Sequence, residues 1–568
     1  MRYLALACDY DGTLARHGHV DDRVVASLEE LSRSGRRLLL VTGRQLPDLE
    51  HAFPRLDLFD RVVAENGALL YRPATREEIP LGQAPPPGFV ERLRAHGVDP
   101  LAVGRAIVAT WQPHETAVLE AIRELGLEWQ VIFNRGAVMA LPSGVNKATG
   151  LQAALDELRL SAHNVVGVGD AENDHAFLSL CECAVAVANA LPSLRAQADW
   201  VTRADHGAGV VELVERLLAS DLEELGPALS RHAIPLGHAG ERLLTLDPYA
   251  PNVLVAGTSG SGKSTFTTGI LERIAERGYQ YCIIDPEGDY QNLGIVSFGD
   301  AGQAPALDQA LQLLEEPDQS VVINLLGVSI EDRPRTFETV FSKLLALRAQ
   351  TGRPHWIVID EAHHMLPEHN LRAGEILGPA AHGLVFITVH PDHVAHDALA
   401  VVDRVLVIGH SPAETLRQFG ETAGVRPPRV DPAPLATGDA LDWPVNSRAA
   451  PLRFVSIPPR TERRRHTRKY AEGELPPDRS FYFRGPDGRL NLRAQNLAIF
   501  LQSAEGVDDD TWIHHLRRGD YSRWFREAIK DPSLADDISR IERMPDTPPR
   551  ETRRLVRQQI EKRYSAPP

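Results

Sequence analysis

A glycine-rich stretch near the middle of the chain places the strongest constraint on its fold. Residues 257–265 read GTSGSGKST and fit the phosphate-binding pattern G-x-x-x-x-G-K-[ST] without a mismatch. An apolar run, residues 252–256, precedes the stretch, and residues 266–277 after it carry apolar side chains at helical spacing. We therefore expect a strand, a loop and a helix in succession.

This loop predicts a site for the phosphates of a nucleotide. Its glycines let backbone N–H groups turn toward one centre at a helix N-terminus, where the helix dipole favours an anion. Lys263 would neutralise the β- and γ-phosphates of ATP, and Ser264 would hold Mg²⁺. A plain glycine-rich turn is the alternative, and both flanking patterns argue against it. The loop residues expected to bind the cofactor are Gly257, Gly260, Gly262, Lys263, Ser264 and Thr265.

The length and charge of the chain limit its domain organisation and its possible partners. A chain of 568 residues is too long for one hydrophobic core, and its length suggests about three or four domains. The formal net charge of −16 would repel nucleic acid, although a local basic patch could still bind it. No run approaches about 18 consecutive apolar residues, so we expect neither a membrane span nor a signal peptide.

The cysteines point to a reducing compartment. Four cysteines are too few for a disulfide framework, which favours a cytoplasmic location. Cys181 and Cys183 have the spacing of half a metal site, but the sequence has no second such pair. We therefore expect both to be buried free thiols.

Two carboxylates stand where the first apolar run of the chain ends. Residues 3–7 read as a strand, and CDYDGTL follows, with Asp9 and Asp11 two positions apart. Side chains at that spacing in a strand point to one side, so both can converge on one reacting group as the chain turns at Gly12. A hard cation such as Mg²⁺ would offset their repulsion. A solvated acidic turn is the alternative for this piece taken alone.

Other strand ends with polar residues follow in order. Thr42 comes directly after a buried apolar strand pattern, and Lys147 opens a helical pattern. A later apolar run leads into GDAEND, which contains Asp170 and Asp174. Ligands of open parallel sheets bind outside the carboxyl ends of the strands, so these residues are expected to meet in one crevice. The alternation of strands and helices predicts an α/β fold.

With these motifs in place, residues 1 to about 218 resemble the haloacid dehalogenase (HAD) superfamily of phosphohydrolases, in its Cof-type or IIB subclass. The segments ENGA at 65–68 and ANALP at 188–192, with residues 198–210, also resemble that subclass. The resemblance implies a Rossmann-like α/β domain that carries a small α/β cap at about residues 83–142.

The resemblance also implies a role for each motif residue. Asp9 would attack phosphorus to form an aspartyl-phosphate, and Asp11 would protonate the leaving oxygen and later activate water. Thr42 and Lys147 would hold the phosphoryl oxygens. The implied metal site consists of Asp9, Asp170 and the backbone carbonyl of Asp11 around Mg²⁺, with Asp174 and Asn173 supporting the metal end of the site.

The cap region would select the substrate. Phosphoglycolate and small sugar phosphates are typical substrates of the family, and the sequence does not choose between them. Trp111, Phe133 and Arg135 are candidates for the pocket wall, although an aromatic residue in a small domain more often belongs to the core. The expected cap elements are helices near 88–96 and 113–126 and strands near 103–110 and 129–141.

A second acidic strand end follows the phosphate-binding loop. Residues 281–284 form a strand pattern that closes on DPEGDY, and residues 356–359 close on Asp360 and Glu361. In the arrangement of a Walker B motif, Asp360 would bind in the Mg²⁺ shell and Glu361 would orient or deprotonate the attacking water. An ordinary acidic strand end is the alternative.

Residues 221–445 resemble the HerA and FtsK superfamily of P-loop ATPases, through DPEGDY at 285–290 and DEAH at 360–363. Relatives often form rings that pump DNA, so the resemblance allows a homo-oligomer. One departure is His390, where those proteins usually carry a glutamine after a strand. Residues 221–237 ahead of this region read as helix and linker.

No residue is a clear candidate for an arginine finger, because the basic segment of the HerA and FtsK family is only partly present in this sequence. Arg335, Arg353 and Arg372 are weak candidates and read as solvated surface residues. His363 and His364 are adjacent and do not share a face, which favours a structural role over a metal site.

Residues 446–568 are predicted to be mostly helical, after proline-rich pieces that mark a boundary. The basic run at 463–469 reads as a solvated linker, with binding of nucleic acid or an acidic partner as the alternative. Helices are expected at 491–503, 508–518, 522–529 and 552–564, with Trp512, Trp524 and Phe525 as core anchors.

The sequence thus predicts a bifunctional protein with domains at residues 1–220, 221–445 and 446–568. It would join an Mg²⁺-dependent phosphatase of a small phosphorylated metabolite, a P-loop domain that binds and hydrolyses ATP, and a helical region. A nucleic-acid-associated ATPase or translocase, with an accessory phosphatase for nucleotides or ends, is the alternative. A scaffold with inert sites is a third hypothesis, which the complete motifs disfavour. Nucleic acid is not favoured as a partner, and no membrane partner is expected.

Overall fold

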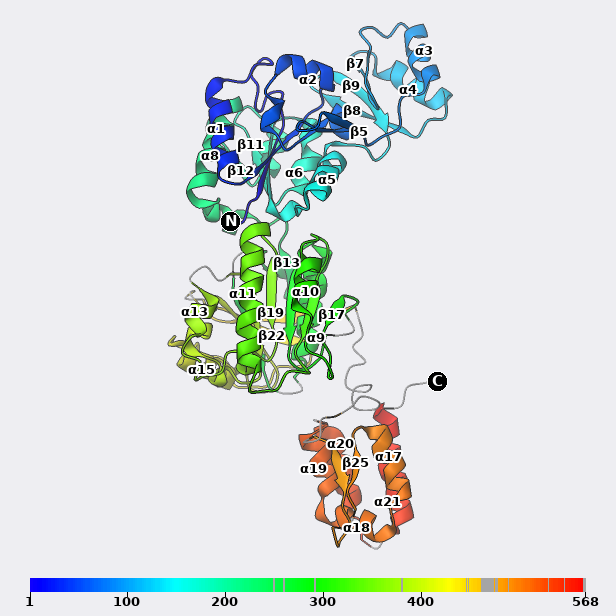
Figure 1. Ribbon diagram of the computed structural model, residues 1–568, viewed down its shortest axis with the longest axis vertical. Coiled ribbons are helices and arrows are strands. Elements are labelled where there is room, and N and C mark those ends of the chain that lie inside the picture. The colour runs from blue at the N-terminus through cyan, green and yellow to red at the C-terminus, as the bar shows by residue number, and fades with distance from the viewer. Residues whose placement is uncertain are drawn as a thin grey trace. The chain divides into compact units, whose positions relative to one another are not determined.

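The computed structural model divides into two compact units, Met1–Pro459 and Arg460–Pro568. The first unit contains two large sheets and one small sheet, and the second is built mostly of helices (Figure 1). The residues that the structure describes are 1–248, 251–258, 261–290, 293–378, 382–445, 447, 449–460, 475, 479–488, 490–529, 531–545 and 547–564.

The first large sheet has the order β12-β11-β10-β1-β2-β3-β4-β5. Its first six strands in that order run parallel, and β4 and β5 extend the sheet in antiparallel fashion. Strand β1 is central and fully buried, as expected of a parallel strand covered on both faces. The strands are β1 Ala5–Cys8, β2 Arg37–Val41, β3 Arg61–Ala64, β4 Leu69–Arg72, β5 Glu77–Pro80, β10 Val165–Gly169, β11 Cys183–Ala186 and β12 Trp200–Val201.

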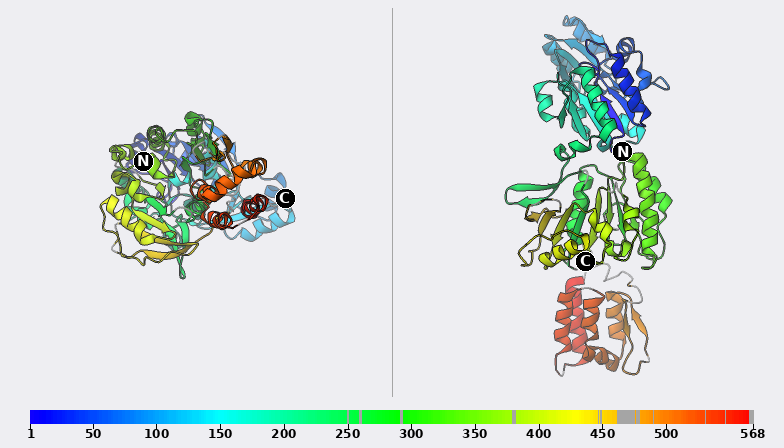
Figure 2. Two further views of the ribbon diagram at one scale, coloured as in Figure 1. Left: turned by 90° about the horizontal axis from the view of Figure 1, so that it is seen from below. Right: turned by 90° about the vertical axis from the view of Figure 1, so that its left-hand side faces the viewer.

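Helices cover both faces of this sheet. Helices α1 and α8 lie side by side over one face, and α5 and α6 pack together over the other (Figures 1 and 2). The N-cap residue Asn146 fixes the start of α5, because its side chain accepts the N–H groups of Ala148 and Thr149. The helical segments are α1 Asp22–Arg33, α2 Leu46–Ala52, α5 Lys147–Leu158, α6 His175–Leu180, α7 Pro192–Gln197 and α8 His206–Ser220, with the short turns η1 Leu56–Leu58, η2 Glu65–Gly67, η3 Ala162–Asn164 and η4 Glu172–Asp174.

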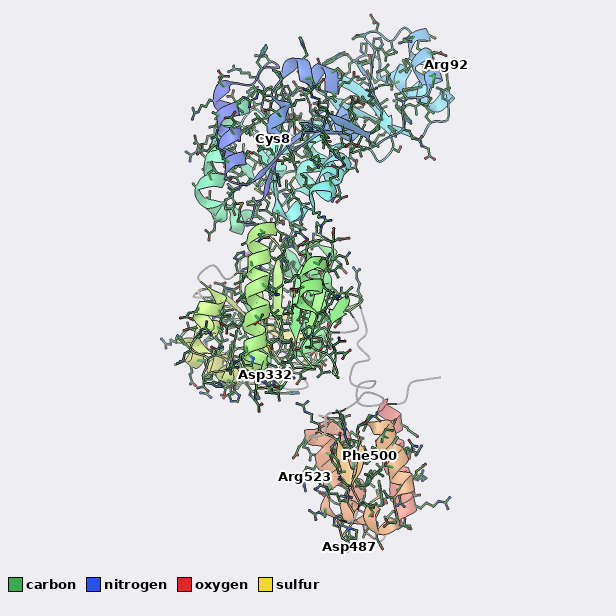
Figure 3. The ribbon with its side chains drawn as sticks, in the orientation of Figure 1. Cys8, Arg92, Asp332, Asp487, Phe500 and Arg523 are labelled. Atoms are coloured by element: carbon green, nitrogen blue, oxygen red, sulfur yellow. The ribbon has the colours of Figure 1, made fainter. Side chains whose placement is uncertain are left out.

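The cap is a four-stranded antiparallel sheet of order β6-β7-β9-β8 with two helices, and Arg92 lies on one of them (Figure 3). Both predicted strand regions are divided into pairs of strands. The second pair turns at Arg135 and Gly136, which have φ of 46° and 89°, the left-handed values that a tight hairpin turn requires. The elements are β6 Ala102–Val103, β7 Val108–Trp111, β8 Trp129–Asn134, β9 Ala137–Pro142, α3 Pro87–Ala95 and α4 Glu115–Glu124.

The second large sheet has the order β14-β13-β23-β22-β21-β15-β20-β19-β16-β18-β17. From β21 to β17 all neighbours run parallel, and the other strands add an antiparallel edge. The strands are β13 Ile234–Ala239, β14 Arg242–Leu246, β15 Val253–Gly257, β16 Tyr281–Asp285, β17 Val296–Phe298, β18 Val321–Asn324, β19 Trp356–Ile359, β20 Leu384–Thr388, β21 Arg404–Ile408, β22 Asp439–Pro444 and β23 Leu452–Ser456.

Two predictions about the edges of this domain differ from the structure. Residues 221–237, read as helix and linker, contain the turn η5 Glu223–Ala228 and the start of β13, which pairs with β14 and β23. Strand β23 lies beyond the predicted boundary at 446 and still belongs to this sheet, because it pairs with β22.

The second sheet separates two hydrophobic cores. Leu254 and Ala256 of β15 face one core, whereas Val253 and Val255 face the other, as the two-residue period of a strand requires. The helices are α9 Lys263–Glu276, α10 Leu307–Leu314, α11 Arg333–Thr351, α12 Ala362–Met365, α13 Ala373–Leu377, α14 His396–Ala400 and α15 Pro412–Ala423, with the turn η6 Pro391–His393.

The second unit packs helices around an aromatic core that includes Phe500 (Figure 3). The predicted helix at 491–503 is wrong at its start, where strand β25 pairs with β24 and Asn496 then caps α17 by accepting the N–H of Ile499 at 2.8 Å. Helix α20 was not predicted. Trp512, Trp524 and Phe525 are buried core residues as predicted. The elements are β24 Phe481–Phe483, β25 Leu492–Ala494, α17 Leu497–Gly506, α18 Asp509–Arg518, α19 Asp520–Glu527, α20 Pro532–Glu542 and α21 Pro549–Tyr564. Among the described helices of both units, none is long and apolar enough to cross a bilayer.

Candidate active site

Three buried carboxylates meet at the carboxyl edge of the first sheet. Asp9 follows β1 and Asp170 follows β10, and these two strands are neighbours in parallel register. Asp174 lies at the end of η4. One carboxylate oxygen from each of the three lies within 4.8 Å of the others, and all three side chains are buried. Oxygen ligands gathered in this way fit Mg²⁺.

Lys147 is the cation that faces these carboxylates. Its Nζ donates to Asp9 Oδ1 at 2.5 Å and to Asp174 Oδ1 at 2.6 Å. The side chain is buried at the N-terminus of α5, where the dipole of the helix also favours an anion. A phosphoryl group beside Asp9 would therefore meet a fixed positive charge.

Burial and mutual repulsion govern the protonation of the carboxylates. Burial, with the charges of Asp174 and Asp170, raises the pKa of Asp9, and Lys147 opposes that shift. Burial and Asp174 raise the pKa of Asp170 to about 6. Burial lowers the pKa of Lys147, but the carboxylates of Asp174 and Asp9 raise it above its ordinary value overall. A divalent cation among the three carboxylates would favour their ionised forms.

Hydrogen bonds fix the acidic loop of the site. Asp174 Oδ2 accepts the backbone N–H of Asp170 at 2.8 Å and that of Ala171 at 2.9 Å, which leaves Oδ1 for Lys147. Asn173 donates to the side-chain oxygen of Asn66 at 3.0 Å. The loop at 170–174 is thus held by its own backbone and by the turn after β3.

Asp11 and Thr42 lie beside this group, and the structure adds a residue that the sequence analysis missed. Arg44 donates from Nε and Nη2 to the two carboxylate oxygens of Asp11, each at 2.7 Å. The carboxylate of Asp11 is not among the three that cluster, and the expected use of its backbone carbonyl stays a prediction. Thr42 is fully buried, and its hydroxyl accepts the N–H of Arg44 at 3.1 Å. The position of Arg44 directly after Thr42 and Gly43 was the available signal.

The cap reaches this site through its hairpin turn. Arg135 pairs with the carboxylate of Asp170. Trp111 lies opposite Ala137 in β9 and Phe133 lies opposite Val138, so the two aromatic side chains are on opposite faces of the cap sheet. Trp111 and Phe133 therefore cannot line one pocket together.

Glu65, which the sequence analysis named only as part of the ENGA turn, joins the base of the cap to the first domain. Its buried carboxylate accepts the N–H of Arg105 and that of Ala106, each at 2.9 Å. Its φ is 51°, a left-handed value that costs a non-glycine residue energy and persists where the surroundings demand it. A Cβ at Gly104 would lie 2.6 Å from this carboxylate, so the backbone of the cap must approach without a side chain.

The phosphate-binding loop follows β15 and leads into α9, as predicted. Lys263 Nζ donates to the carbonyl oxygens of Gly257 at 2.8 Å and Thr258 at 3.0 Å. Gly262 has φ of 90°, which suits glycine at the start of the helix. Ser264 is half-buried and Thr265 is exposed in the first turn. Among the predicted loop residues, Gly260 lies outside the described part of the chain.

Acidic residues stand at the carboxyl ends of β16 and β19. Asp285 and Asp360 are buried, and burial together with Glu361 and Asp285 raises the pKa of Asp360 well above its ordinary value. Glu361 has φ of 44°, a strained conformation of the kind found at functional sites. A cation near Asp360 would offset this concentration of negative charge.

Histidines border the acidic strand ends. His363 Nδ1 lies 3.1 Å from Thr388 Oγ1 at the end of β20, and its ring packs edge-on to His390 at 5.9 Å between centroids. Burial and the neighbouring histidines lower the pKa of His363 to about 3, so this ring is neutral. The structural role of His363 stays a prediction.

Of the three arginines considered for an arginine finger, Arg353 and Arg372 have other partners. Arg372 pairs with Glu338 at 3.0 Å on the surface, and Arg335 is exposed. The prediction that Arg353 is a solvated surface residue is wrong, because its side chain is buried and donates to the carbonyl oxygen of Arg159 at 3.0 Å.

Cys181 and Cys183 are buried free thiols as predicted, and burial raises the pKa of Cys181 to about 12. The basic run at 463–469 lies outside the described residues.

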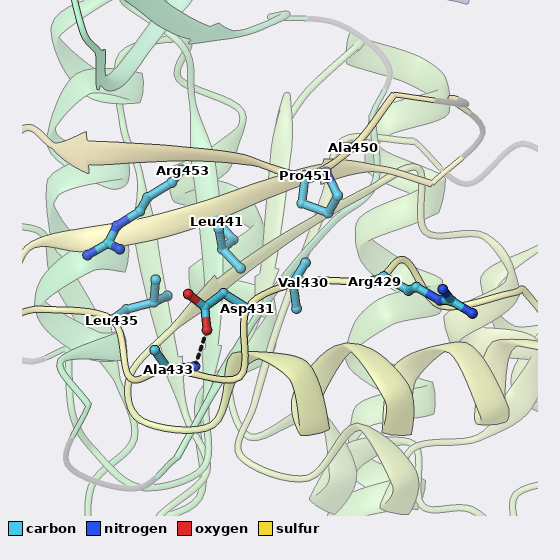
Figure 4. Close-up of a pocket in the computed structure, with 9 residues that line it drawn as sticks. All are labelled: Arg429, Val430, Asp431, Ala433, Leu435, Leu441, Ala450, Pro451 and Arg453. Carbon is cyan, nitrogen blue, oxygen red and sulfur yellow. Dashed lines mark hydrogen bonds between the residues drawn. The ribbon is translucent and has the colours of Figure 1, made fainter.

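A separate pocket of the second domain lies between β22, β23 and the segment at 429–435 (Figure 4). Asp431 within it accepts the backbone N–H of Ala433 at 2.9 Å. Its lining contains none of the predicted site residues, so neither candidate site opens into it.

Two protein families match parts of the chain. Residues 6–83 and 117–214 match the haloacid dehalogenase-like hydrolases, and residues 250–339 match the central domain of the helicase HerA. A phosphoglycolate phosphatase of Methanothermobacter thermautotrophicus is 31% identical over 226 residues, which cover 98% of that protein and 38% of this chain. One of Haloarcula marismortui is 34% identical over 219 residues, covering 95% of that protein and 37% of this chain.

Among solved structures, a haloacid dehalogenase-like hydrolase from Bacteroides thetaiotaomicron is similar to the chain with a TM-score of 0.34 and 20% identity, covering 99% of that protein and 38% of this chain. The resemblance predicted from the motifs is confirmed by the sequence matches, including the Rossmann-like α/β fold of the first domain. The chain belongs to the haloacid dehalogenase-like hydrolases, and in it a phosphatase domain of that family is fused to a HerA-like domain.

Proposed function

We propose that the chain is a Cof-type phosphatase that hydrolyses the phosphate monoester of a small metabolite at the carboxyl edge of the first sheet, with Mg²⁺ as its metal ion. The contact of Lys147 with both Asp9 and Asp174 carries this proposal. It gathers a nucleophile, a fixed cation and metal-binding carboxylates around one point. That combination suits an in-line attack on a phosphoryl group.

The residues of the site divide the reaction between them. Asp9 attacks phosphorus and forms an aspartyl-phosphate, while Asp11 gives a proton to the departing alcohol oxygen. Asp11 then takes a proton from water, and the water oxygen attacks phosphorus to release inorganic phosphate and free Asp9. Lys147 and Thr42 donate hydrogen bonds to the phosphoryl oxygens. A bound Mg²⁺, held by Asp9, Asp170 and the carbonyl of Asp11, would neutralise charge on the phosphoryl group.

Phosphoglycolate is the substrate that we favour. The two relatives compared above are both named phosphoglycolate phosphatases. Arg135 brings a guanidinium group from the cap to Asp170, and its side chain is 48% exposed. Arginine binds carboxylates through a planar pair of donors, so this residue suits a substrate with a second anionic group.

Release of inorganic phosphate from a panel of phosphorylated metabolites, with Mg²⁺, tests the phosphatase. We expect phosphoglycolate to be hydrolysed and Asp9→Asn to abolish the activity. Arg135→Gln should raise KM for phosphoglycolate more than KM for p-nitrophenyl phosphate, which lacks the carboxylate. If no phosphomonoester in the panel is hydrolysed, the proposed function is wrong.

We propose in addition that the second domain binds and hydrolyses ATP. Lys263 at the start of α9 and the acidic ends of β16 and β19 support this proposal. Lys263→Ala should abolish binding of ATP. Glu361→Gln should retain binding and slow hydrolysis by about 100-fold or more, because the residue that activates water is lost. The surface variant Glu338→Gln is the matched control and should hydrolyse ATP at the normal rate.

A nucleic-acid-associated motor is the second candidate, and the match of residues 250–339 to the helicase HerA favours it. ATP hydrolysis that DNA stimulates, with a steep dependence on salt, would support this function. A rate of ATP hydrolysis that DNA leaves unchanged at low salt would count against it.

A further inference from the structure

A buried polar cluster joins the two α/β domains of the first unit, and neither proposed reaction uses it. We call His163, Glu182 and Tyr279 the interdomain cluster. The rings of His163 and Tyr279 are stacked, with centroids 3.7 Å apart and planes 20° apart. Glu182 Oε2 lies 2.7 Å from His163 Nδ1 and accepts the hydroxyl of Tyr279 at 2.8 Å.

Oxygen atoms face both ring nitrogens of His163. His163 Nε2 lies 2.7 Å from the carbonyl oxygen of Arg277, as Nδ1 lies close to Glu182. Arg2 donates to the other oxygen of Glu182 at 3.0 Å. Burial raises the pKa of Glu182, but His163 and Arg2 lower it to about 2. Hydrogen bonds to His163, Tyr279 and Arg2 occupy the carboxylate, so they account for the site better than a metal ion shared with His232.

A second set of contacts lies next to the cluster. Arg353, buried in the second domain, donates to the carbonyl oxygen of Arg159 in the first. Asn164 donates to the carbonyl oxygen of Gly352 at 3.5 Å. A Cβ at Gly352 would come within 2.5 Å of the Asn164 side chain, so this close approach depends on glycine. Two turns of the second domain, 277–280 and 352–355, therefore rest on the first domain.

In the second domain, these turns lie at the ends of elements whose other ends carry the nucleotide site. Helix α9 begins at Lys263 and ends directly before Arg277. Strand β16 runs from the first turn to Asp285, and β19 runs from the second turn to the residue before Asp360. A shift of α9 along its axis would therefore appear at both the nucleotide loop and Arg277.

The first domain repeats this arrangement. Strand β10 begins two residues after His163 and leads to Asp170, and α5 begins at Lys147 and ends directly before Arg159. The two domains thus meet at the ends of elements opposite their candidate sites. Strand β10 has 5 residues and spans about 17 Å at about 3.3 Å per residue. Helix α9 has 14 residues and spans about 21 Å at about 1.5 Å per residue.

We propose that His163 and Glu182 are positioning residues for the phosphatase site. Nucleotide that binds at the loop ending in Lys263 acts through these two residues and changes phosphatase turnover. This inference rests on the proposed functions of the two sites. Lys263 Nζ is held by the carbonyl oxygens of Gly257 and Thr258, and nucleotide phosphates would compete for it. The resulting movement at the start of α9 changes the position of the Arg277 carbonyl, and His163 passes the change to β10 and Asp170.

The test compares phosphatase kinetics of the full chain with and without a non-hydrolysable ATP analogue. Tyr279→Phe removes the hydroxyl contact with Glu182 and keeps the ring. Tyr71→Phe is the matched control, because it removes a hydroxyl that donates to Glu50 at 3.5 Å within the first domain. We expect the analogue to change kcat/KM by about fivefold or more in the wild type and in Tyr71→Phe. Tyr279→Phe should keep the basal rate and the affinity for the analogue but lose most of this response.

Hydrogen exchange of the β10 amides, with and without the analogue, separates this inference from the phosphatase proposal. A chain that hydrolyses no phosphomonoester but shows nucleotide-dependent exchange in β10 would contradict the phosphatase proposal and uphold the connection. Bound nucleotide that alters neither turnover nor exchange would overturn the inference, and so would a full response in Tyr279→Phe. In Lys263→Ala, the analogue should change neither phosphatase turnover nor hydrogen exchange. If the wild type does not bind nucleotide, both the inference and the proposed nucleotide site are wrong.

Discussion

The guanidinium group of Arg44 holds the carboxylate of Asp11 through two hydrogen bonds of 2.7 Å each. The Asp11 side chain is otherwise 45% exposed, so this pair determines where the carboxylate points. The hydrogen bond with Asp11 raises the pKa of Arg44, which remains a cation. Because the proposed acid and base of the reaction is Asp11, Arg44 would orient the proton transfer.

Replacing Arg44 with alanine should lower kcat by about 100-fold, because a misplaced catalytic group costs about that factor. KM should change little, since in the proposed reaction Lys147 and Thr42, not Arg44, would hold the substrate phosphoryl group. Phosphate release under saturating substrate measures the effect. Arg55→Ala is the control, because Arg55 pairs with Asp57 on the surface at 3.1 Å. Equal kcat values for both variants would contradict this role of Arg44.

Lys147→Met should destabilise the first domain, because it leaves Asp9 and Asp174 buried without their cation. Removing one partner from a buried ion pair costs about 3–5 kcal/mol. Urea unfolding of the full chain without Mg²⁺ measures the loss, and Mg²⁺ should restore part of it by placing a cation among the carboxylates. The control is Lys343→Met, which breaks the surface pair with Asp308 and should cost far less than the loss of the buried pair. Similar losses for the two variants would contradict the prediction.

Binding of Mg²⁺ should strengthen as the pH rises through about 6, the pKa to which burial and Asp174 raise Asp170. Protons compete with the metal ion below that pH, because the carboxylate must be ionised to bind it. Without metal, the folded state binds this proton more tightly than the unfolded chain, whose carboxyl has a pKa near 3.8. Protonated Asp170 therefore stabilises the folded state fully below pH 3.8, and this stabilisation is lost as the pH rises to about 6.

Isothermal titration with Mg²⁺ across this range measures the dependence. Asp170→Asn should bind Mg²⁺ weakly at every pH, without the rise in affinity near pH 6. Asp48→Asn, on the surface, should keep that rise in affinity. An affinity that stays constant from pH 5 to pH 8 would contradict the prediction.

Gly12→Ala should inactivate the phosphatase. A Cβ at Gly12 would lie 2.3 Å from Asp170 Oδ2, so the side chain of Asp170 would have to move. Gly35 is a matched control, because its φ of 92° is as positive as the 83° of Gly12 and its Cβ would meet nothing within 4 Å. Gly35→Ala should cost about 1 kcal/mol of stability from backbone strain and keep its activity. Measuring kcat and the unfolding midpoint of both variants distinguishes the contact of the new Cβ with Asp170 from the effect of backbone strain alone.

The strand-end motifs of both domains could be predicted because each depends on a short stretch of chain. An apolar run followed by Asp9 or by Asp360 indicates a buried strand with a carboxylate at its end, and no distant contact is needed to recognise it. The helical tail shows the limit of such patterns, because the start of the predicted helix at 491–503 became strand β25. The partner strand β24 decided that conformation.

The sequence by itself determined that the chain carries two sets of motif residues at the strand ends of α/β domains, because the spacing of these residues follows from local geometry. The tertiary structure decided which charges those residues meet. Arg44 reaches Asp11, Glu65 reaches the backbone of the cap, and Tyr279 reaches Glu182. Each of these contacts joins residues from different elements, so it exists only after the sheets have formed and brought those elements together.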